Sequence, residues 1–219
     1  MIGAGGHGKV IADIALKMNK WKYIAFLDDS ENVKISMGIE IIDKSTSVSK
    51  YIEDYDIFVG IGNNVVRKKV QEELEDLGAI IPVLIHPSAI IGEQVYLGAG
   101  TVVMAGAVIN CCTKIGKGCI INTASTIDHD NKIDDYVHIS PGAHLAGTVR
   151  VGSGTWLGIG SVVINNIYIT NDCKIGAGAV VIRDIAEAGT YVGVPAKGWT
   201  NRTIKGEGKW SCYTNIYFI

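Results

Sequence analysis

The sequence predicts a small α/β layer over residues 1–84, joined to a hexapeptide-repeat β-helix over residues 85–185. Two observations carry this prediction. Predicted strands and helices alternate in the first part, beginning with a glycine-rich loop. In the second part, an aliphatic residue recurs at every sixth position. Residues 186–219 follow the repeat as a loop and a tail.

The composition suits one large or two small globular domains. The chain has 219 residues, of which 47% are hydrophobic, and a formal net charge of −2. Because it has no basic run, we expect neither nucleic acid nor a membrane as a partner. The five cysteines show no C-x-x-C spacing, so we expect no disulfide framework or zinc site. With no apolar signal region at the N-terminus, the sequence favours a cytoplasmic protein.

The first element of the α/β layer is the segment "MIGAGGHGKVIADIALKMNKW", which predicts a strand end, a glycine loop and a helix. "KYIAFLDDS" and "DIFVGIGNN" predict two further strands. "NVVRKKVQEELEDLG" predicts a helix with its charges on one face. "AIIPVLIHP" predicts a last strand that leads into the repeat. About four strands are too few for a dinucleotide-binding domain.

The glycine loop "GAGGHG" at 3–8 opens the first predicted helix. Backbone N–H groups at such a helix start, with the helix dipole, can hold a phosphate. Asp28 and Asp29 end the second predicted strand, about 20 residues further on, where a carboxylate contacts a ribose in dinucleotide-binding folds. The loop predicts a site for a single nucleotide, such as the handle of a nucleotide sugar. A plain turn is the alternative.

The repeat is unbroken from Ile85 to Val181: all seventeen positions six residues apart are Ile, Leu or Val. The residue four places later is mostly small, and glycine often follows the aliphatic residue. A period of six predicts one short strand and one turn per hexad. Three hexads close a triangular coil, which stacks each residue about 4.8 Å from its neighbour 18 positions on. A β-sandwich would need less regular turn spacing.

Three segments carry a family resemblance: "GAGGHGKV", "DHDNKIDDYVHISPGAHLAG" inside the repeat, and "VGVPAK" at 192–197. Together they resemble the sugar O-/N-acetyltransferases of the sialic acid O-acetyltransferase and bacillosamine-pathway N-acetyltransferase type. The resemblance implies a left-handed parallel β-helix, a homotrimer, acetyl-CoA as donor and a sugar as acceptor. In better-understood members, the acceptor is the 4-amino group of a UDP-linked 4-amino-4,6-dideoxy sugar.

The sequence departs from this family at both ends. Only Met1 and Ile2 stand before the glycine loop, where members have a full hydrophobic strand. The tail "GWTNRTIKGEGKWSCYTNIYFI" replaces a short ending. Its aromatic residues either pack on the coil or stay disordered.

The resemblance assigns the catalytic pair to His129 and Asp130, at an outward position of the repeat. A sugar amine or hydroxyl must lose a proton as it attacks a thioester, and a histidine with a pKa near 7 suits that transfer. Asp130 is expected to raise the basicity of His129 and fix its tautomer. Because aspartate is one methylene shorter than the more common glutamate, the contact is expected to be weak or mediated by water.

His138 lies nine residues after His129, half a coil away. A perimeter of 18 residues at ~3.3 Å each puts the two histidines on different faces, roughly 15 Å apart. They can share a site only between subunits, so we predict active sites at the interfaces of a homotrimer. The resemblance assigns His138 to the thioester carbonyl of acetyl-CoA; a packing histidine is the alternative. His144 is expected on the solvated surface.

The resemblance also assigns the remaining site residues, including the glycine loop and the two aspartates already singled out. For acetyl-CoA they are Gly147, Ile159, Ala177, Gly193 and Lys197. For the nucleotide-sugar acceptor they are Gly5, Gly6, His7, Asp28, Asp29, Gly62, Asn63, Arg67 and Asn122. Arg67 is expected to offer a guanidinium fork to a phosphate. Lys197 is expected to contact a phosphate of acetyl-CoA, with a solvated lysine as the alternative.

Three functions compete. The first is N-acetylation of a nucleotide-linked amino sugar, with UDP as the preferred nucleotide, by direct transfer without a metal or an acyl-enzyme. The second is O-acetylation of sialic acid or another surface-polysaccharide sugar. The third is a non-catalytic hexapeptide scaffold or a metal-binding trimer of the carbonic anhydrase kind. The glycine loop with its paired aspartates favours the first, because a free sugar has no phosphate to hold.

Overall fold

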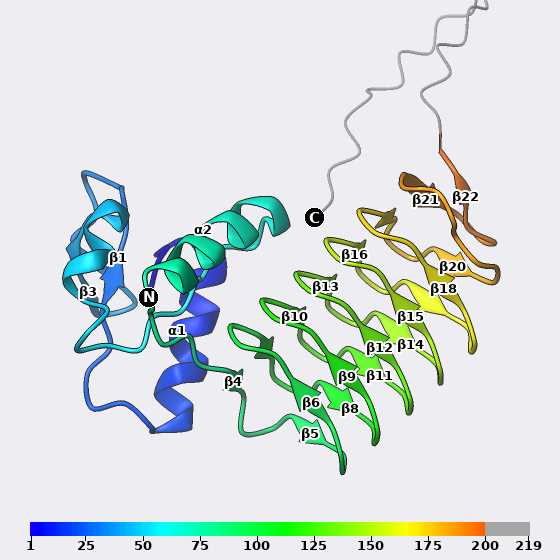
Figure 1. Cartoon of the computed structure of the whole chain (residues 1–219), viewed down its shortest axis with the longest axis horizontal. Coiled ribbons are helices and arrows are strands. Elements are labelled where there is room, and N and C mark those ends of the chain that lie inside the picture. The colour runs from blue at the N-terminus through cyan, green and yellow to red at the C-terminus, as the bar shows by residue number, and fades with distance from the viewer. Residues whose placement is uncertain (200–219) are drawn as a thin grey trace, which may run out of the picture.

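The computed structural model describes residues 1–199 as an α/β unit packed against a three-sided coil of short strands (Figure 1). Most of the tail that departs from the family, including Cys212, lies outside the described residues. Within residues 1–199, no helix has the length and apolar character needed to cross a bilayer.

The N-terminal unit contains the predicted glycine loop and two helices. Its elements are α1 (Gly6–Met18), β1 (Phe26–Leu27), β2 (Ile35–Ser36), β3 (Ile39–Asp43), the 3-10 helix η1 (Ser45–Lys50) and α2 (Asn64–Asp76). β1 pairs in parallel with β3, and Ile2 forms parallel bridges with both Leu27 and Val59. The parallel layer is therefore confirmed.

Two details of this layer differ from the prediction. The third expected strand, at 56–64, pairs with Ile2 at one isolated bridge, because Ile2 is the last residue before the chain turns into the glycine loop. The sequence-based prediction also omitted the hairpin of β2 and β3. Its turn residues Met37 and Gly38 both have positive φ, at 54° and 76°, as a tight two-residue hairpin requires.

The coil has three parallel sheets, which we number I to III. Sheet I contains β4 (Leu84–Ile85), β7 (Val102–Val103), β10 (Ile120–Ile121), β13 (His138–Ile139), β16 (Trp156–Leu157) and β19 (Lys174–Ile175). Sheet II contains β5 (Ile90–Ile91), β8 (Val108–Ile109), β11 (Thr126–Ile127), β14 (His144–Leu145), β17 (Val162–Val163) and β20 (Val180–Val181). Sheet III contains β6 (Tyr96–Leu97), β9 (Lys114–Ile115), β12 (Lys132–Ile133), β15 (Arg150–Val151) and β18 (Tyr168–Ile169).

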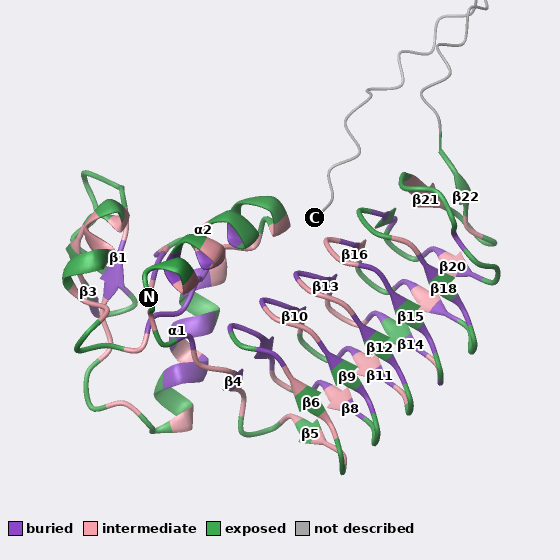
Figure 2. Cartoon of the chain, in the orientation of Figure 1, coloured by how far each residue is buried: buried purple, intermediate pink, exposed green. Residues whose placement is uncertain are grey.

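The predicted stacking at 18-residue intervals is confirmed by the strand register. Ile127, for example, pairs with Ile109 below and Leu145 above. The second residue of nearly every coil strand points inward and joins one continuous aliphatic core, whereas the first residue points outward. The two-residue strands therefore present one column of outward side chains on each sheet. Figure 2 shows how burial varies along the strands of the coil.

The N-terminal unit covers the first half of sheet I. An apolar cluster joins Ile11 of α1 to outward residues of this sheet, among them Leu84 and Ile120. α2 runs beside the corners between sheets III and I (Figure 1). Three of its side chains, Gln71, Arg67 and Asn64, donate to backbone carbonyls at successive corners of the coil: Ala99, Gly118, Tyr136 and Gly154.

Sheet I continues beyond β19 into the end of the described chain. β21 (Thr190–Val192) pairs in parallel with β19 and then in antiparallel with β22 (Lys197–Gly198). The hairpin contains a cis Val194–Pro195 peptide bond. This is the segment that the family resemblance placed over the far end of acetyl-CoA.

Candidate active site

The expected base, His129, lies at the corner between β11 of sheet II and β12 of sheet III. Its Nδ1 lies 2.8 Å from Oδ2 of Asp130, and its side chain is 55% exposed. The contact is direct, so the expectation of a weak or water-mediated interaction was wrong. Asp130 reaches the ring because its backbone adopts positive φ, 58°, which turns the short side chain back along the corner.

The Asp130 carboxylate raises the pKa of His129 above its usual value, and the neighbouring Asp128 acts in the same direction. Asp128 is itself fixed by Asn110, whose Nδ2 donates over 2.8 Å. With the proton on Nδ1, shared with Asp130, the Nε2 atom presents its lone pair to a reactant. The corner therefore holds an accessible imidazole with one defined acceptor atom.

Gly147 lies one coil above His129, against the imidazole ring. A Cβ atom at position 147 would lie 2.6 Å from Cε1 of His129. Glycine is needed here for the close approach of the ring, since its backbone does not adopt positive φ. This places the expected cofactor residue Gly147 in contact with the expected base.

The floor of this corner is a polar rung inside the coil, at Asn131. Its buried Nδ2 donates to the carbonyls of Asp128, at 2.7 Å, and Ala146, at 2.9 Å. Its side-chain oxygen accepts from the Val149 N–H. Asparagine occupies an interior position that is mostly small or aliphatic elsewhere, and it ties the coil of His129 to the next one.

His138 lies on sheet I, the face opposite the corner that carries His129. The two histidines therefore lie on different sides of one coil, as predicted. The His138 ring is 8% exposed, stacks on Trp156 at 5.3 Å between centroids, and has Nε2 3.1 Å from Nδ2 of Asn122. Burial, with the nearby Arg67 and His7, lowers the pKa of His138 to about 3, so the ring stays neutral near pH 7. Its Nδ1 has no partner within the described chain.

His7 belongs to the same buried environment. Its ring packs against Gly62 and its Nε2 is buried without a partner in residues 1–199. Burial, followed by the charge of Arg67, lowers the pKa of His7 to about 4. The structure thus gathers three residues expected in two different sites, His7, Asn122 and His138, at one junction between the α/β unit and sheet I. His144, by contrast, is exposed on β14, as expected.

The glycine loop forms a bare helix start. Gly5 is the N-cap of α1 and supplies no side-chain cap, so the first N–H groups of the helix are open to a ligand. Gly8 backs directly onto Gly3, whose carbonyl oxygen would lie 1.9 Å from a Cβ at position 8. The loop therefore requires glycine at that position for packing. Gly5 and Gly6 have open space in the place of a side chain.

Asp28 and Asp29 lie at the end of β1, beside this loop. Asp28 accepts from the N–H groups of Ala4, at 2.7 Å, and Ser30, at 2.9 Å. Asp29 accepts from the backbone and hydroxyl of Ser45. Both acids line a cavity of about 630 Å³ whose other wall is largely aliphatic: Val48, Ile61, Val66, Val70, Leu74 and Leu77. The sequence-based prediction missed this aliphatic wall, which comes from η1 and α2.

Arg67 has a different role from the one expected. Its side chain is 1% exposed, and its N–H donors face protein oxygens. Nε donates to Gly118 at 2.7 Å, and the two terminal nitrogens donate to Ile61, Gly62, Asn64 and Tyr136. No fork remains for a phosphate, so the expectation was wrong and Arg67 joins the two units instead. Asn63 caps α2 by accepting from the Val66 N–H at 3.1 Å.

The remaining residues expected at acetyl-CoA lie near the other corner of sheet II or in the terminal hairpin. Ile159 and Ala177 are exposed at the corner between sheets I and II, one coil apart. Gly193 and Lys197 are exposed around the β21–β22 hairpin. None of them approaches His129 within one chain, because sheet II separates the two corners. Among residues 1–199, no three His, Cys, Asp or Glu side chains gather as metal ligands would.

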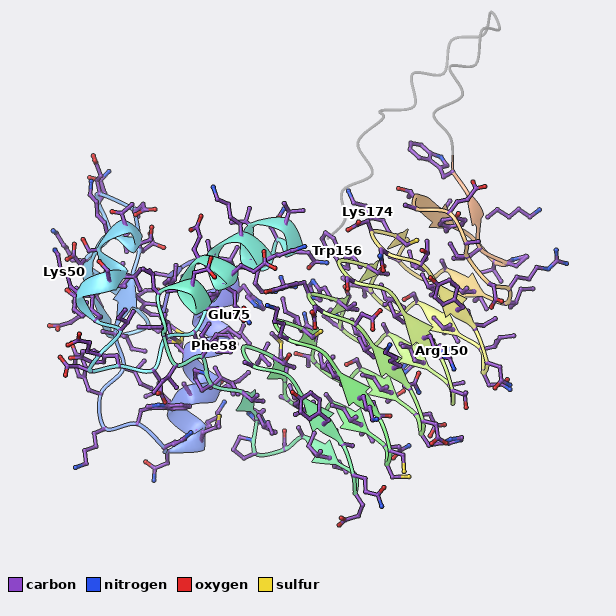
Figure 3. The ribbon with its side chains drawn as sticks, in the orientation of Figure 1. Lys50, Phe58, Glu75, Arg150, Trp156 and Lys174 are labelled. Carbon is purple, nitrogen blue, oxygen red and sulfur yellow. The ribbon has the colours of Figure 1, made fainter. Side chains whose placement is uncertain are left out.

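Trp156 is the clearest residue that the sequence-based prediction missed. It stacks on His138 and donates from Nε1 to the hydroxyl of Ser140 at 2.7 Å. Its position is 18 residues after His138, so following the outward column of sheet I would have found it. Figure 3 shows Trp156 on the side of the coil next to α2.

Comparison with known proteins gives consistent matches along the chain. Residues 1–74 match the family described as the PglD N-terminal domain. The chain is 28% identical over 185 residues to a GDP-perosamine N-acetyltransferase of Escherichia coli O157:H7, covering 81% of this chain and 82% of that protein. It is 40% identical over 109 residues to a UDP-N-acetylbacillosamine N-acetyltransferase of Bacillus subtilis, covering 48% and 50% of the two chains.

Solved structures agree with these relatives. The acetyltransferase domain of PglB from Neisseria gonorrhoeae has a TM-score of 0.87 and 40% identity, over 90% of this chain and 97% of that one. It has also been solved with acetyl coenzyme A. PerB from Caulobacter crescentus, solved in complex with CoA and GDP-perosamine, has a TM-score of 0.86 and 35% identity, over 91% and 95%. The chain belongs to the hexapeptide-repeat sugar N-acetyltransferase family of the bacillosamine and perosamine type, with the predicted α/β and β-helix fold.

Proposed function

We propose that the protein transfers the acetyl group of acetyl-CoA to the 4-amino group of a nucleotide-linked 4-amino-4,6-dideoxy sugar, with His129 as general base. The observation that carries this proposal is the exposed His129–Asp130 pair, 2.8 Å apart, with the imidazole lying against Gly147. Family members that act on GDP- and UDP-linked sugars support it. The UDP sugar is our first choice, since the identity to the UDP-type relative is higher where the two align.

The acceptor's nucleoside fits the cavity beside the glycine loop. Asp28 and Asp29 supply carboxylates for ribose hydroxyls, and the aliphatic wall of η1 and α2 supplies an apolar surface for the base. The bare start of α1 at Gly5 and Gly6 lies beside this cavity and suits a phosphate. His7 then stands between the nucleotide and sheet I, where its free Nε2 can bond to the sugar.

A homotrimer brings the two halves of the site together. The outward positions of sheet II include no Asp, Glu, Lys or Arg: they are Ile90, Val108, Thr126, His144, Val162 and Val180. We place this sheet of each copy toward a common threefold axis. The His129 corner of one copy then adjoins the corner with Ile159 and Ala177 of the next, beside the sheet that carries His138. Acetyl-CoA would occupy the groove between the two copies.

The transfer is direct. The neutral amine attacks the thioester carbonyl carbon while Nε2 of His129 takes one proton from the amine nitrogen. The C–S bond then breaks, and the imidazolium returns the proton to the departing CoA thiolate. Asp130 stabilises the imidazolium in between. A neutral His138 from the adjacent copy can donate a hydrogen bond to the thioester oxygen as negative charge develops there. Because CoA and nucleotide sugars are cytoplasmic metabolites, we place the reaction in the cytoplasm.

The test is a thiol-release assay with acetyl-CoA and a panel of acceptors: UDP-, GDP- and dTDP-linked 4-amino sugars, and free sialic acid. We expect thiol release with a nucleotide-linked amino sugar, and a mass increase of one acetyl group on its amine. Release with sialic acid alone would instead support the O-acetyltransferase alternative. The mass of the native assembly, measured by light scattering, should be three times that of the chain.

A further inference from the structure

Sheet III presents a column of three cations, which we call the basic column: Lys114, Lys132 and Arg150. They are the outward residues of β9, β12 and β15, and the register pairs Lys132 directly with Lys114 on one side and Arg150 on the other. All three are exposed. Figure 3 shows Arg150 on a different side of the coil from Trp156 and Lys174.

The basic column is electrostatically unfavourable in the isolated chain. Like charges directly opposite on neighbouring strands, about 4.8 Å apart, repel each other. Asp134 lies 3.6 Å from Lys132, but no carboxylate of residues 1–199 lies within 4.0 Å of Lys114 or Arg150. The chain as a whole has a net charge of −2, so general basicity does not explain the column. An anionic ligand would remove the repulsion.

The basic column borders the catalytic corner. Lys132 follows His129 by three residues in the same coil, and Arg150 follows Gly147 by three residues in the next. The His129 ring leans toward that next coil, where it lies against Gly147. A ligand that places its reactive group at His129 and extends over sheet III therefore passes the side chains of Lys132 and Arg150.

The acceptor cavity of the N-terminal unit lacks a cation of its own. Its lining includes Asp28, Asp29 and Glu73 but, within the described chain, no lysine or arginine. Arg67, on the same helix as part of this lining, is fully engaged with protein oxygens. A diphosphate held near the glycine loop would thus depend on backbone N–H groups, unless another subunit supplies positive charge.

We propose that Lys132 and Arg150, assisted by Lys114, bind the diphosphate of a substrate in the groove between two subunits, facing sheet I of the neighbouring copy. This inference rests on the proposed function and its trimer. The ligand class is a diphosphate diester, which both the nucleotide sugar and CoA contain. The basic column thereby replaces the phosphate contact that Arg67 does not make.

The test measures KM for each substrate separately in the variant Lys132→Ala/Arg150→Ala. We expect KM for one of the two to rise about tenfold or more, with kcat changed little, because a charge-assisted contact is lost in ground and transition state alike. Product inhibition by free CoA and by the free nucleotide diphosphate identifies the source, since only the affected one should weaken. Asp134→Asn, which frees Lys132, should lower the same KM. Lys34→Ala, an exposed cation on β2's flank, should change neither.

Direct binding separates this inference from the proposed function. Calorimetry with CoA, UDP and GDP needs no turnover, so it decides the matter even if no acceptor in the panel is acetylated. If wild type and the double variant bind all three ligands with equal affinity, in trimers of equal mass, the basic column does not bind a diphosphate and the inference is wrong. If no acceptor in the panel is acetylated but the double variant binds CoA or a nucleotide more weakly than wild type, the role of the basic column is supported and the choice of acceptor is wrong.

Discussion

Two histidine environments in one chain differ in almost every physical respect. His129 is 55% exposed, paired with a carboxylate and has a raised pKa. His138 is 8% exposed, stacked on an indole and has a pKa lowered to about 3. The first environment suits a group that takes up and releases a proton, and the second suits one that stays neutral near pH 7. The fold produces the difference by placing one at an open corner and the other under the α/β unit.

The sharpest test of this contrast is His129→Ala. Without the base, the amine proton has no acceptor in the groove, so we expect kcat to fall by roughly 10²–10⁴. The thiol-release assay measures the loss, and light scattering checks that the assembly is unchanged. Full activity in the variant would show that His129 is not the base.

A smaller effect is expected for Asp130→Asn. The amide cannot stabilise the imidazolium, so the pKa of His129 should fall and the acid limb of the pH–rate profile should move to lower pH. Turnover at neutral pH should drop about tenfold to hundredfold. A pH profile identical to wild type would mean that the 2.8 Å contact does not tune the base. His138→Asn should leave this acid limb in place, because the neutral ring does not titrate there.

The approach of the ring to Gly147 gives the next prediction. Gly147→Ala places a Cβ 2.6 Å from Cε1 of His129, so the ring must move and kcat should fall about tenfold. Gly189→Ala is a matched control, since its Cβ would meet only an ordinary contact at 3.6 Å, from Tyr191. If both variants keep full activity, the observed ring position is not the productive one.

The two histidines with lowered pKa values give a prediction of a different kind, on stability instead of turnover. Their folded pKa values, about 4 for His7 and about 3 for His138, lie below the ordinary 6.5. The unfolded chain therefore binds more protons below pH 6.5, and stability is lost as pH falls from 6.5 toward 4. Each histidine contributes a slope of at most about 1.4 kcal/mol per pH unit. Urea unfolding at several pH values in this range gives the free energy of unfolding at each pH. We expect this free energy to fall less steeply with decreasing pH in His7→Asn/His138→Asn than in wild type.

The repeat made the coil predictable in detail, because one period fixes strand, turn, interior and stacking partner together. The same logic placed His129 and His138 on different faces. The α/β layer was less predictable: β2 and β3 depend on a turn at Met37–Gly38 whose residues carry little signal in the sequence alone. Arg67 was misjudged because its partners Gly118 and Tyr136 lie 51 and 69 residues away. Nothing local distinguishes a helix arginine that bonds to distant carbonyls from one that faces solvent.

The hydrogen bonds from α2 to four successive corners of the coil affect the order in which the coil unfolds. A solenoid whose repeats contact only their neighbours can fray one repeat at a time from either end. Here a single helix, α2, bonds to several successive coils. Its side chains Gln71, Arg67 and Asn64 donate to backbone carbonyls from Ala99 to Gly154. Amide exchange in that stretch should be slow and uniform, whereas the turns beyond Leu157, which α2 does not bind, should exchange faster toward β20. The proposed catalytic corner at His129 lies within this stretch, so we expect its geometry to be held by the part of the coil that opens last.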